Sequence, residues 1–225
     1  MKIKGLFLRC WSILSHPHWW LNGKTIVFLS KIKGQEGNSL EMERCWVKKS
    51  DISFYGKENK IDLKNCEIFN STIFLRGEGH RLIIEEGVHL YNMWIKIIGS
   101  GNTVHIGKKS SFGSGHIISG GKGTDIQIGQ GCMIAEGVDI WSTDTHSIFQ
   151  DGELINPPVS ITIGNHVWIG KNVAILKGVT IGDNAVIGMR SLVTKSIRPG
   201  TLNIGSPSKE IKEGIEWNRR NPNNL

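Results

Sequence analysis

Residues 161–194 read ITIGNHVWIGKNVAILKGVTIGDNAVIGMRSLVT, and a large aliphatic residue recurs there at every sixth position. This first series comprises Ile163, Ile169, Ile175, Ile181, Ile187 and Val193. A second series, offset by four residues, comprises Val167, Val173, Val179, Ala185 and Ser191. A period of six fits neither an isolated α-helix, with a period of 3.6, nor a continuous strand, with a period of two. It indicates short strands joined by regular turns, with three strands to each triangular coil.

The preceding part of the chain repeats with a longer period. Glycine-led turns are each followed, five residues on, by an apolar residue, and these apolar residues recur every 21 or 22 positions. The apolar series is Leu40, Ile61, Leu82, Val104 and Ile126, and Ile161 and Val179 continue it. Stacked coils would place these side chains in one buried column and pair their strands in parallel, about 4.8 Å apart. An ordinary β-sandwich does not hold one spacing over so many steps, so an all-β solenoid is predicted.

One segment interrupts the repeat. Ile126 and Ile161 are 35 residues apart, more than one coil needs, although Ile128, Ile134 and Ile140 keep the six-residue step. Residues 141–158 are therefore predicted to leave the column as an extruded loop that contains WSTDTHSIFQDGE. Such loops on rigid scaffolds often carry function.

Composition restricts the function classes. The 225 residues include 28 glycines and carry a formal net charge of +7, which favours anionic partners without choosing among them. The four cysteines form no CxxC pair, so buried free thiols in a reducing cytoplasm are expected rather than a zinc knuckle. No apolar run reaches the roughly 20 residues of a membrane span, and the N-terminus does not have the pattern of a signal peptide.

The hexapeptide stretch, continued to Ile197, resembles the hexapeptide-repeat acyltransferases. Together with STDTHSIF at residues 142–149, it is similar to their sugar and polysaccharide O-acetyltransferase branch, and the resemblance is strongest over residues 126–210. It implies a left-handed parallel β-helix with an extruded catalytic loop, homotrimers, active sites in clefts between subunits, and acetyl-CoA as donor without a metal. The function it implies is transfer of acetyl to a hydroxyl of a sugar or a capsule or O-antigen polysaccharide.

The same resemblance implies roles for loop residues. His146 matches the family's general base, which would take the proton of the acceptor hydroxyl as it attacks the thioester. Asp144, two residues earlier, is a candidate to orient the imidazole, although it could equally be an exposed turn residue.

Donor and acceptor candidates follow by position in the motif. Trp168 matches a tryptophan beside the thioester end of CoA in related enzymes, and the other donor candidates are Ser191, Thr194, Lys195, Lys209 and Lys212. Trp141 is a candidate for stacking on a sugar. His116 stands in the region where galactoside- and maltose-acting relatives carry an acceptor-binding asparagine. Each of these residues could instead be structural.

Three alternatives remain at this point. A nucleotide-sugar N-acetyltransferase would acetylate an amine on the same scaffold. A γ-type carbonic anhydrase would need zinc ligands from His105, His116, His146 or His166, but the sequence lacks a closely spaced ligand pair. A non-enzymatic solenoid would not need His146, Trp168 and Lys195 together. Nucleic acid is not expected as a partner.

The domain organisation follows from these patterns. Residues 1–23 are predicted to form an arm or helix that caps the solenoid, with contact to a membrane surface as the alternative. Residues 24–206 are predicted to form the β-helix. Residues 207–225 are predicted to form a short helix over 207–217 and a disordered tail.

Overall fold

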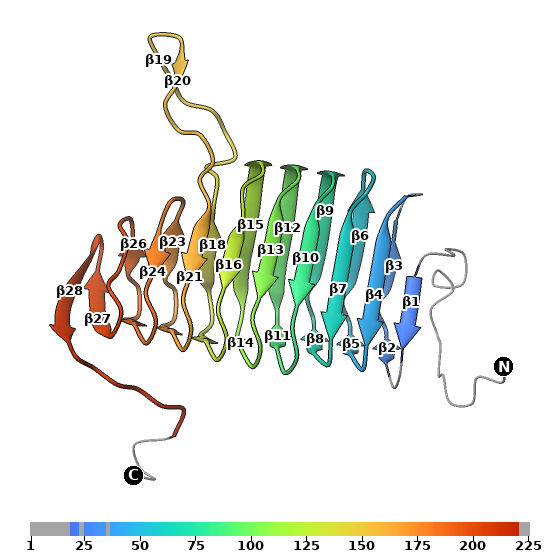
Figure 1. The fold of residues 1–225 in the computed structure, drawn as a ribbon, viewed down its shortest axis with the longest axis horizontal. Helices are drawn as coiled ribbons and strands as arrows, with labels where there is room; N and C mark the ends of the chain where they lie inside the picture. The colour runs from blue at the N-terminus through green and yellow to red at the C-terminus, as the bar shows by residue number, and fades with distance from the viewer. Residues whose placement is uncertain (1–18, 23–24, 35–36, 221–225) are drawn as a thin grey trace.

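The chain winds into a solenoid of parallel strands, seen from the side in Figure 1. The computed structural model describes residues 19–22, 25–34 and 37–220, and every regular element in them is a β-strand. Each coil contributes one strand to each of three sheets, called A, B and C here. The described part of the chain contains no helix that could cross a membrane.

Sheet A contains eight of the described strands, each paired in parallel with the equivalent strand of the next coil. They are β1 (Trp19–Asn22), β4 (Ser39–Glu43), β7 (Lys60–Lys64), β10 (Arg81–Ile84), β13 (Thr103–Ile106), β16 (Ile126–Ile128), β21 (Ile161–Ile163) and β24 (Thr180–Ile181).

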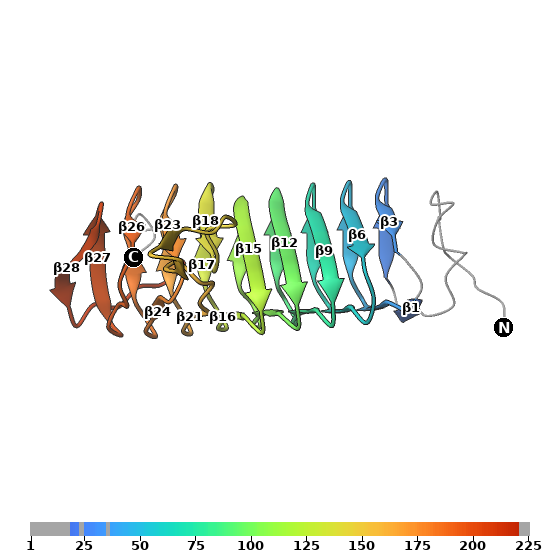
Figure 2. The ribbon, with the colours of Figure 1, turned by 90° about the horizontal axis from the view of Figure 1, so that it is seen from above.

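Sheet C also contains eight described strands, and Figure 2 shows them side by side. They are β3 (Lys31–Lys33), β6 (Asp51–Tyr55), β9 (Thr72–Glu78), β12 (Met93–Ser100), β15 (Gly115–Lys122), β18 (Val138–Trp141), β23 (Ala174–Leu176) and β26 (Leu192–Val193).

Sheet B contains ten described strands, of which the last is antiparallel to its neighbour. They are β2 (Ile26–Phe28), β5 (Trp46–Lys48), β8 (Glu67–Phe69), β11 (His89–Tyr91), β14 (Ser111–Phe112), β17 (Met133–Ile134), β22 (Trp168–Ile169), β25 (Val186–Ile187), β27 (Thr201–Gly205) and β28 (Ser208–Glu213).

The predicted columns are confirmed. Leu82, Val104, Ile126 and Ile161 are register partners in successive strands of sheet A, and all four are completely buried. The six-residue series is buried as well: Ile163, Ile169, Ile175, Ile181, Ile187 and Val193. Because alternate residues of a strand point to opposite faces, the residues between them remain on the surface and are free to form sites.

The 21- and 22-residue repeats have a second structural cause at the corner between sheets C and A. The backbone N–H of Asn59 donates to Asn38 Oδ1, and that of His80 donates to Asn59 Oδ1. The donor–acceptor distance is 3.0 Å in both hydrogen bonds. The ladder continues through Asn102 to Thr124. Gly77 stands beside this ladder with φ of 126°, and a Cβ there would lie 1.9 Å from the carbonyl oxygen of Gly99, so only glycine fits.

The buried thiols expected from the sequence are present in the described residues. Cys45, Cys66 and Cys132 are free and buried. The Cys66 thiol lies 3.4 Å from that of Cys45 in the neighbouring coil, and this contact and burial raise the pKa of Cys66. Cys10 lies outside the described residues.

The prediction of a short helix over residues 207–217 is wrong. Residues 208–213 form β28, which pairs antiparallel with β27. The last coil exposes the unpaired N–H and C=O groups of β27, and a second strand satisfies them where a helix would not. Arg198 fixes the added strand through a bidentate ion pair with Glu210 and a contact with Glu213.

Most of the predicted N-terminal arm lies outside the described residues, and its capping or membrane role stays a prediction. Its final part, residues 19–22, is β1, which pairs in parallel with β4. The solenoid therefore includes these residues and begins before the predicted boundary at residue 24.

Candidate active site

The extruded loop leaves the solenoid at the corner between sheets C and A, where β18 ends and β21 begins. It carries a small antiparallel hairpin of β19 (Phe149–Gln150) and β20 (Glu153–Leu154), which projects well beyond the coils in Figure 1. At its base the backbone N–H of Val159 donates to the carbonyl of Ser142 over 3.0 Å, so the two ends of the loop are closed together. The predicted bounds of 141–158 match this excursion closely.

His146 lies on this loop with its side chain exposed. Its Nδ1 atom is 3.0 Å from the hydroxyl oxygen of Thr145, so one ring nitrogen has a neighbour that can fix the ring. The ring borders a hollow of about 240 Å³, which is also lined by Ile98, Gly99, Thr143 and other residues of the loop and of sheet C. If Nδ1 carries the proton and donates it to Thr145, Nε2 is free to accept a proton from a molecule in the hollow.

Asp144 does not contact the His146 ring, so the prediction that it orients the imidazole is wrong. Its carboxylate forms a short ion pair with Lys177 and accepts a hydrogen bond of 2.8 Å from the Asn156 amide. The ammonium of Lys177 holds the pKa of Asp144 below its ordinary value. Asp144 therefore anchors the loop to the following coil and does not hold the His146 ring.

Asn156 and Lys177 complete this anchor, and the sequence interpretation missed both. The side-chain N–H of Asn156 donates to the His146 carbonyl at 2.9 Å. The side-chain oxygen of Asn156 accepts from the backbone N–H of Ile148 at 2.6 Å. Lys177 also donates to the Asn156 carbonyl over 2.9 Å. Together with Asp144 these residues form the loop anchor, and they fix the backbone on which His146 is carried.

Replacing Lys177 with methionine should lower turnover by about 3- to 10-fold, which corresponds to roughly 1 kcal/mol in the activation free energy. The loss of two contacts to the loop anchor would let the His146 backbone move, while the Michaelis constant for the donor stays nearly unchanged. Lys60→Met is the matched control, because Lys60 pairs with Glu41 and Asp62 at 3.3 Å each on sheet A, outside both the loop and the sheet B cavity. Steady-state kinetics of the two variants decide the point, and an equal effect of both would exclude a specific role for the anchor.

The two predicted acceptor residues lie on the outer face of sheet C beside the loop. Trp141 ends β18, and its indole N–H is buried without a hydrogen-bond partner in the described structure. His116 lies on β15, half-buried, with Nδ1 2.6 Å from Asp139 Oδ1. Both residues are thus on the face that leads to the His146 hollow.

Two of the predicted donor residues meet in one cavity on sheet B. Trp168, 39% exposed on β22, and Lys212, on β28, both line a cavity of about 590 Å³ with mostly apolar walls. Ala135 and Met189 also line it. This cavity is called the sheet B cavity below.

Trp217 forms a further wall of the sheet B cavity, and the sequence interpretation missed it. Its ring stacks on His166 at 4.1 Å between centroids and lies 6.0 Å from Trp168, while its indole N–H donates to the His166 carbonyl over 2.8 Å. Arg219 then donates to the Cys132 carbonyl over 2.8 Å. The segment after β28 thus folds back across sheet B and narrows the cavity.

The other predicted donor residues do not join this cavity. Ser191 is buried, and its hydroxyl donates to the Gly188 carbonyl and accepts from the Gly205 N–H, so its position is structural and unsuited to cofactor contact. Thr194 and Lys195 are exposed just after β26, at the corner between sheets C and A. Lys209 is exposed on β28 but does not line the cavity.

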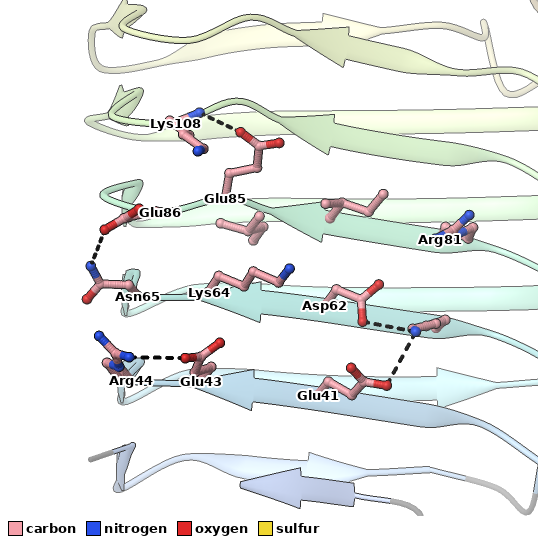
Figure 3. A pocket seen from close by; sticks show the side chains of 13 residues that line it. Glu41, Glu43, Arg44, Asp62, Lys64, Asn65, Arg81, Glu85, Glu86 and Lys108 are labelled. Atoms are coloured by element: carbon pink, nitrogen blue, oxygen red, sulfur yellow. Dashed lines mark hydrogen bonds and ion pairs between the residues drawn. The ribbon is translucent and has the colours of Figure 1, made fainter. Parts of the chain in front are cut away.

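A larger hollow of about 650 Å³ lies on sheet A and has a different character. Figure 3 shows its lining of alternating acids and bases, in which Lys60 pairs with Glu41 and Asp62 at 3.3 Å each. Five of the ten charged side chains are paired with one another, since Arg44 also contacts Glu43, and the hollow contains no residue of the loop. It is a solvated ionic face rather than a catalytic centre.

Within the described residues, no group of three His, Cys, Asp or Glu side chains could hold a metal ion. The four histidines considered as zinc ligands lie on separate elements: His105 on β13, His116 on β15, His146 on the loop and His166 before β22.

Comparison with known proteins gives consistent relatives. Residues 160–195 match the family model of the bacterial transferase hexapeptide (six repeats). The chain is 38% identical over 175 residues to the polysialic acid O-acetyltransferase of Neisseria meningitidis, covering 76% of this chain and 80% of that protein. It is 38% identical over 128 residues to the galactoside O-acetyltransferase of Escherichia coli K12, covering 54% and 61%.

Solved structures agree over more of the chain. The polysialic acid O-acetyltransferase OatWY superposes with a TM-score of 0.79 at 34% identity, covering 85% of this chain and 92% of that one. The polySia-specific acetyltransferase NeuO superposes with a TM-score of 0.73 at 27% identity, covering 93% of both chains.

Proposed function

The chain belongs to the hexapeptide-repeat acyltransferases, enzymes built on the left-handed parallel β-helix, and from this premise we propose that it moves an acetyl group from acetyl-CoA to a hydroxyl of a cell-surface polysaccharide or of its sugar precursors. The names of its relatives, which act on polysialic acid and on galactosides, support a carbohydrate acceptor. The net charge of +7 favours an anionic one.

The observation that carries this proposal is the placement of His146 on an anchored loop, with an open ring nitrogen at the edge of a hollow. A sugar hydroxyl is a weak nucleophile until its proton is removed as it attacks. Nε2 of His146 would accept that proton while the hydroxyl oxygen forms a bond to the thioester carbonyl carbon. The bond to sulfur then breaks, the proton passes to the CoA thiolate, and the products are the acetyl ester and CoA.

The sheet B cavity is the donor site in this proposal. Its apolar walls suit the pantetheine arm, with Trp168 beside the thioester and Lys212 near the phosphates. Within one chain, however, Trp168 lies on sheet B, whereas His146 rises from the corner between the other two sheets. We therefore propose a homotrimer in which the loop of one copy reaches the sheet B cavity of the next.

An N-acetyltransferase acting on an amino sugar is the second candidate, but no feature of the loop favours an amine over a hydroxyl. The reaction is proposed to occur in the cytoplasm, where acetyl-CoA is available and where the free buried thiols of Cys45, Cys66 and Cys132 would persist.

Replacing Lys212 with alanine should raise the Michaelis constant for acetyl-CoA about fivefold at low salt, with little change in turnover, because one phosphate contact is lost. The effect should shrink as salt screens the interaction. Lys209→Ala is the control, because Lys209 lies on the same strand outside the cavity. If Lys209→Ala raised the Michaelis constant for acetyl-CoA more than Lys212→Ala did, this placement of the donor would be refuted.

The function itself is tested by acceptor-dependent release of CoA. Purified protein is mixed with acetyl-CoA and single carbohydrates, including sialic acid oligomers, galactosides and nucleotide amino sugars, and the free thiol is followed with time. The proposal expects release with at least one hydroxyl acceptor above the rate without acceptor. Release only with amino sugars would support the N-acetyltransferase instead, and no release with any acceptor would refute both.

A further inference from the structure

The outer side of sheet C beside the loop carries three rows of residues from β12, β15 and the segment 139–143, of which Ile118, Gly120 and Thr143 are buried. The strand register pairs Trp94 with His116 and His116 with Asp139, and it pairs Ile118 with Trp141. The rows are Trp94, His116 and Asp139, then Lys96, Ile118 and Trp141, then Ile98, Gly120 and Thr143. This set of residues is called the sheet C platform.

Trp94 is the exposed aromatic side chain of the sheet C platform. It is 40% exposed, and His116 packs edge-on against it with 5.4 Å between ring centroids. The Lys96 ammonium lies 5.8 Å from the centre of the same ring. Because Asp139 in turn fixes His116, the indole is held in place with one part of its surface open.

The sheet C platform shares residues with the lining of the His146 hollow. Ile98 and Gly99, on the same strand as Trp94, line that hollow together with Thr143. At about 3.3 Å per residue, Trp94 lies roughly 13 Å along β12 from Ile98. A ligand that occupied both the hollow and the Trp94 ring would therefore have to be longer than one sugar ring.

We propose that Trp94, His116 and Lys96 form a subsite for a second, non-reacting sugar unit of an oligosaccharide whose reacting unit lies beside His146. This inference rests on the proposed function and adds to it that the acceptor is a chain of carboxylated sugars rather than a monosaccharide. The C–H face of a sugar ring packs on an indole, while its hydroxyl groups pair with polar side chains beside the ring. The sheet C platform offers His116 for such pairing.

Charge decides the class of sugar. The Asp139 carboxylate is hydrogen-bonded to His116 and lies two strands from Trp94, so the charged group in contact with the Trp94 ring is the ammonium of Lys96. A cation at this place favours a carboxylated sugar unit. An interface between copies of the chain fits less well, because charged residues such as Lys96 and Asp139 are depleted from the centres of such interfaces.

The test compares Trp94→Ala with wild type on sialic acid acceptors of one to eight units and on neutral galacto-oligosaccharides of the same lengths. The inference expects kcat/KM for the longer sialic acid acceptors to fall on the order of tenfold, with the monomer and acetyl-CoA nearly unaffected. Lys96→Met should weaken the charged acceptors and spare the neutral ones. Trp46→Ala is the matched control, because Trp46 is a similarly exposed tryptophan on sheet B, 44% exposed.

Binding measured without catalysis separates this inference from the proposed function. Calorimetry with His146→Ala protein should give tighter binding of sialic acid octamers than of the monomer, and Trp94→Ala added to it should abolish the difference. Equal affinities for acceptors of all lengths would overturn the proposed subsite, even if acetyl transfer is observed. So would a Trp94→Ala variant that loses the same affinity for the monomer as for the octamer. Dissociation of the oligomer by Trp94→Ala, seen by size-exclusion chromatography, would assign the platform to contact between copies instead.

Discussion

His146→Ala should lower the turnover of acetyl transfer by roughly 100- to 10,000-fold, the usual contribution of a positioned general base. The side chain is exposed on a loop that is anchored by Asp144, Asn156 and Lys177, so its removal leaves the buried columns intact. The melting temperature and the Michaelis constant for acetyl-CoA should therefore remain close to wild type. Steady-state kinetics and thermal unfolding of the purified variant measure both.

The pH dependence of the loop anchor follows from the carboxyl group of Asp144. Its pKa is lowered by Lys177, so the ion pair is present above the ordinary carboxyl pKa and is lost only as pH falls through the lowered value.

His89→Ala is a suitable control for the His146 prediction. His89 is a partly exposed histidine on sheet B with a carboxylate neighbour, Glu67, at 2.9 Å. Its removal should leave turnover nearly unchanged. Near-normal turnover in a folded His146→Ala protein that still binds acetyl-CoA would rule out the role of general base.

The second large effect concerns the proposed sharing of the site between copies. Ala135→Trp should fill the sheet B cavity and abolish donor binding, and His146→Ala should abolish proton removal. Mixed trimers that contain both variants should nevertheless recover about one third of wild-type turnover. In a cyclic trimer, one loop from an Ala135→Trp copy always faces one open cavity of a His146→Ala copy.

Co-expression with two different affinity tags, followed by purification on both, isolates the mixed trimers. The pure variants, purified in the same way, provide the background. If verified mixed trimers turn over no faster than the pure variants, each active site lies within one chain. That result would exclude the shared arrangement and would leave His146 as the base.

The repeat made most of the fold predictable. Leu82, Val104 and Ile126 had to stack because a fixed spacing through several coils has few other physical solutions, and the same spacing exposed the excursion that contains His146. The contacts that position the loop were not predictable in this way. Asp144 and Lys177 are 33 residues apart, and no periodicity specifies which side chain of the following coil meets an irregular loop.

The C-terminal segment illustrates the same limit. The run SKEIKE has residues common in helices, but its conformation is decided by the open edge of β27, which is a property of the assembled solenoid. Trp217 likewise reaches His166 across 51 residues and completes a cavity that Trp168 alone did not indicate. Tertiary context determined both features.

The central claim is that the chain forms an acetyl ester on a sugar hydroxyl with His146 as base, and the mass of the acceptor tests it most directly. A sialic acid octamer is incubated with acetyl-CoA and either wild-type or His146→Ala protein, then analysed by mass spectrometry before and after mild alkali. The account predicts added acetyl groups with the wild type, almost none with the variant, and their complete loss in alkali, which cleaves esters. An acetylated product that survives alkali, or equal product from both proteins, would contradict it.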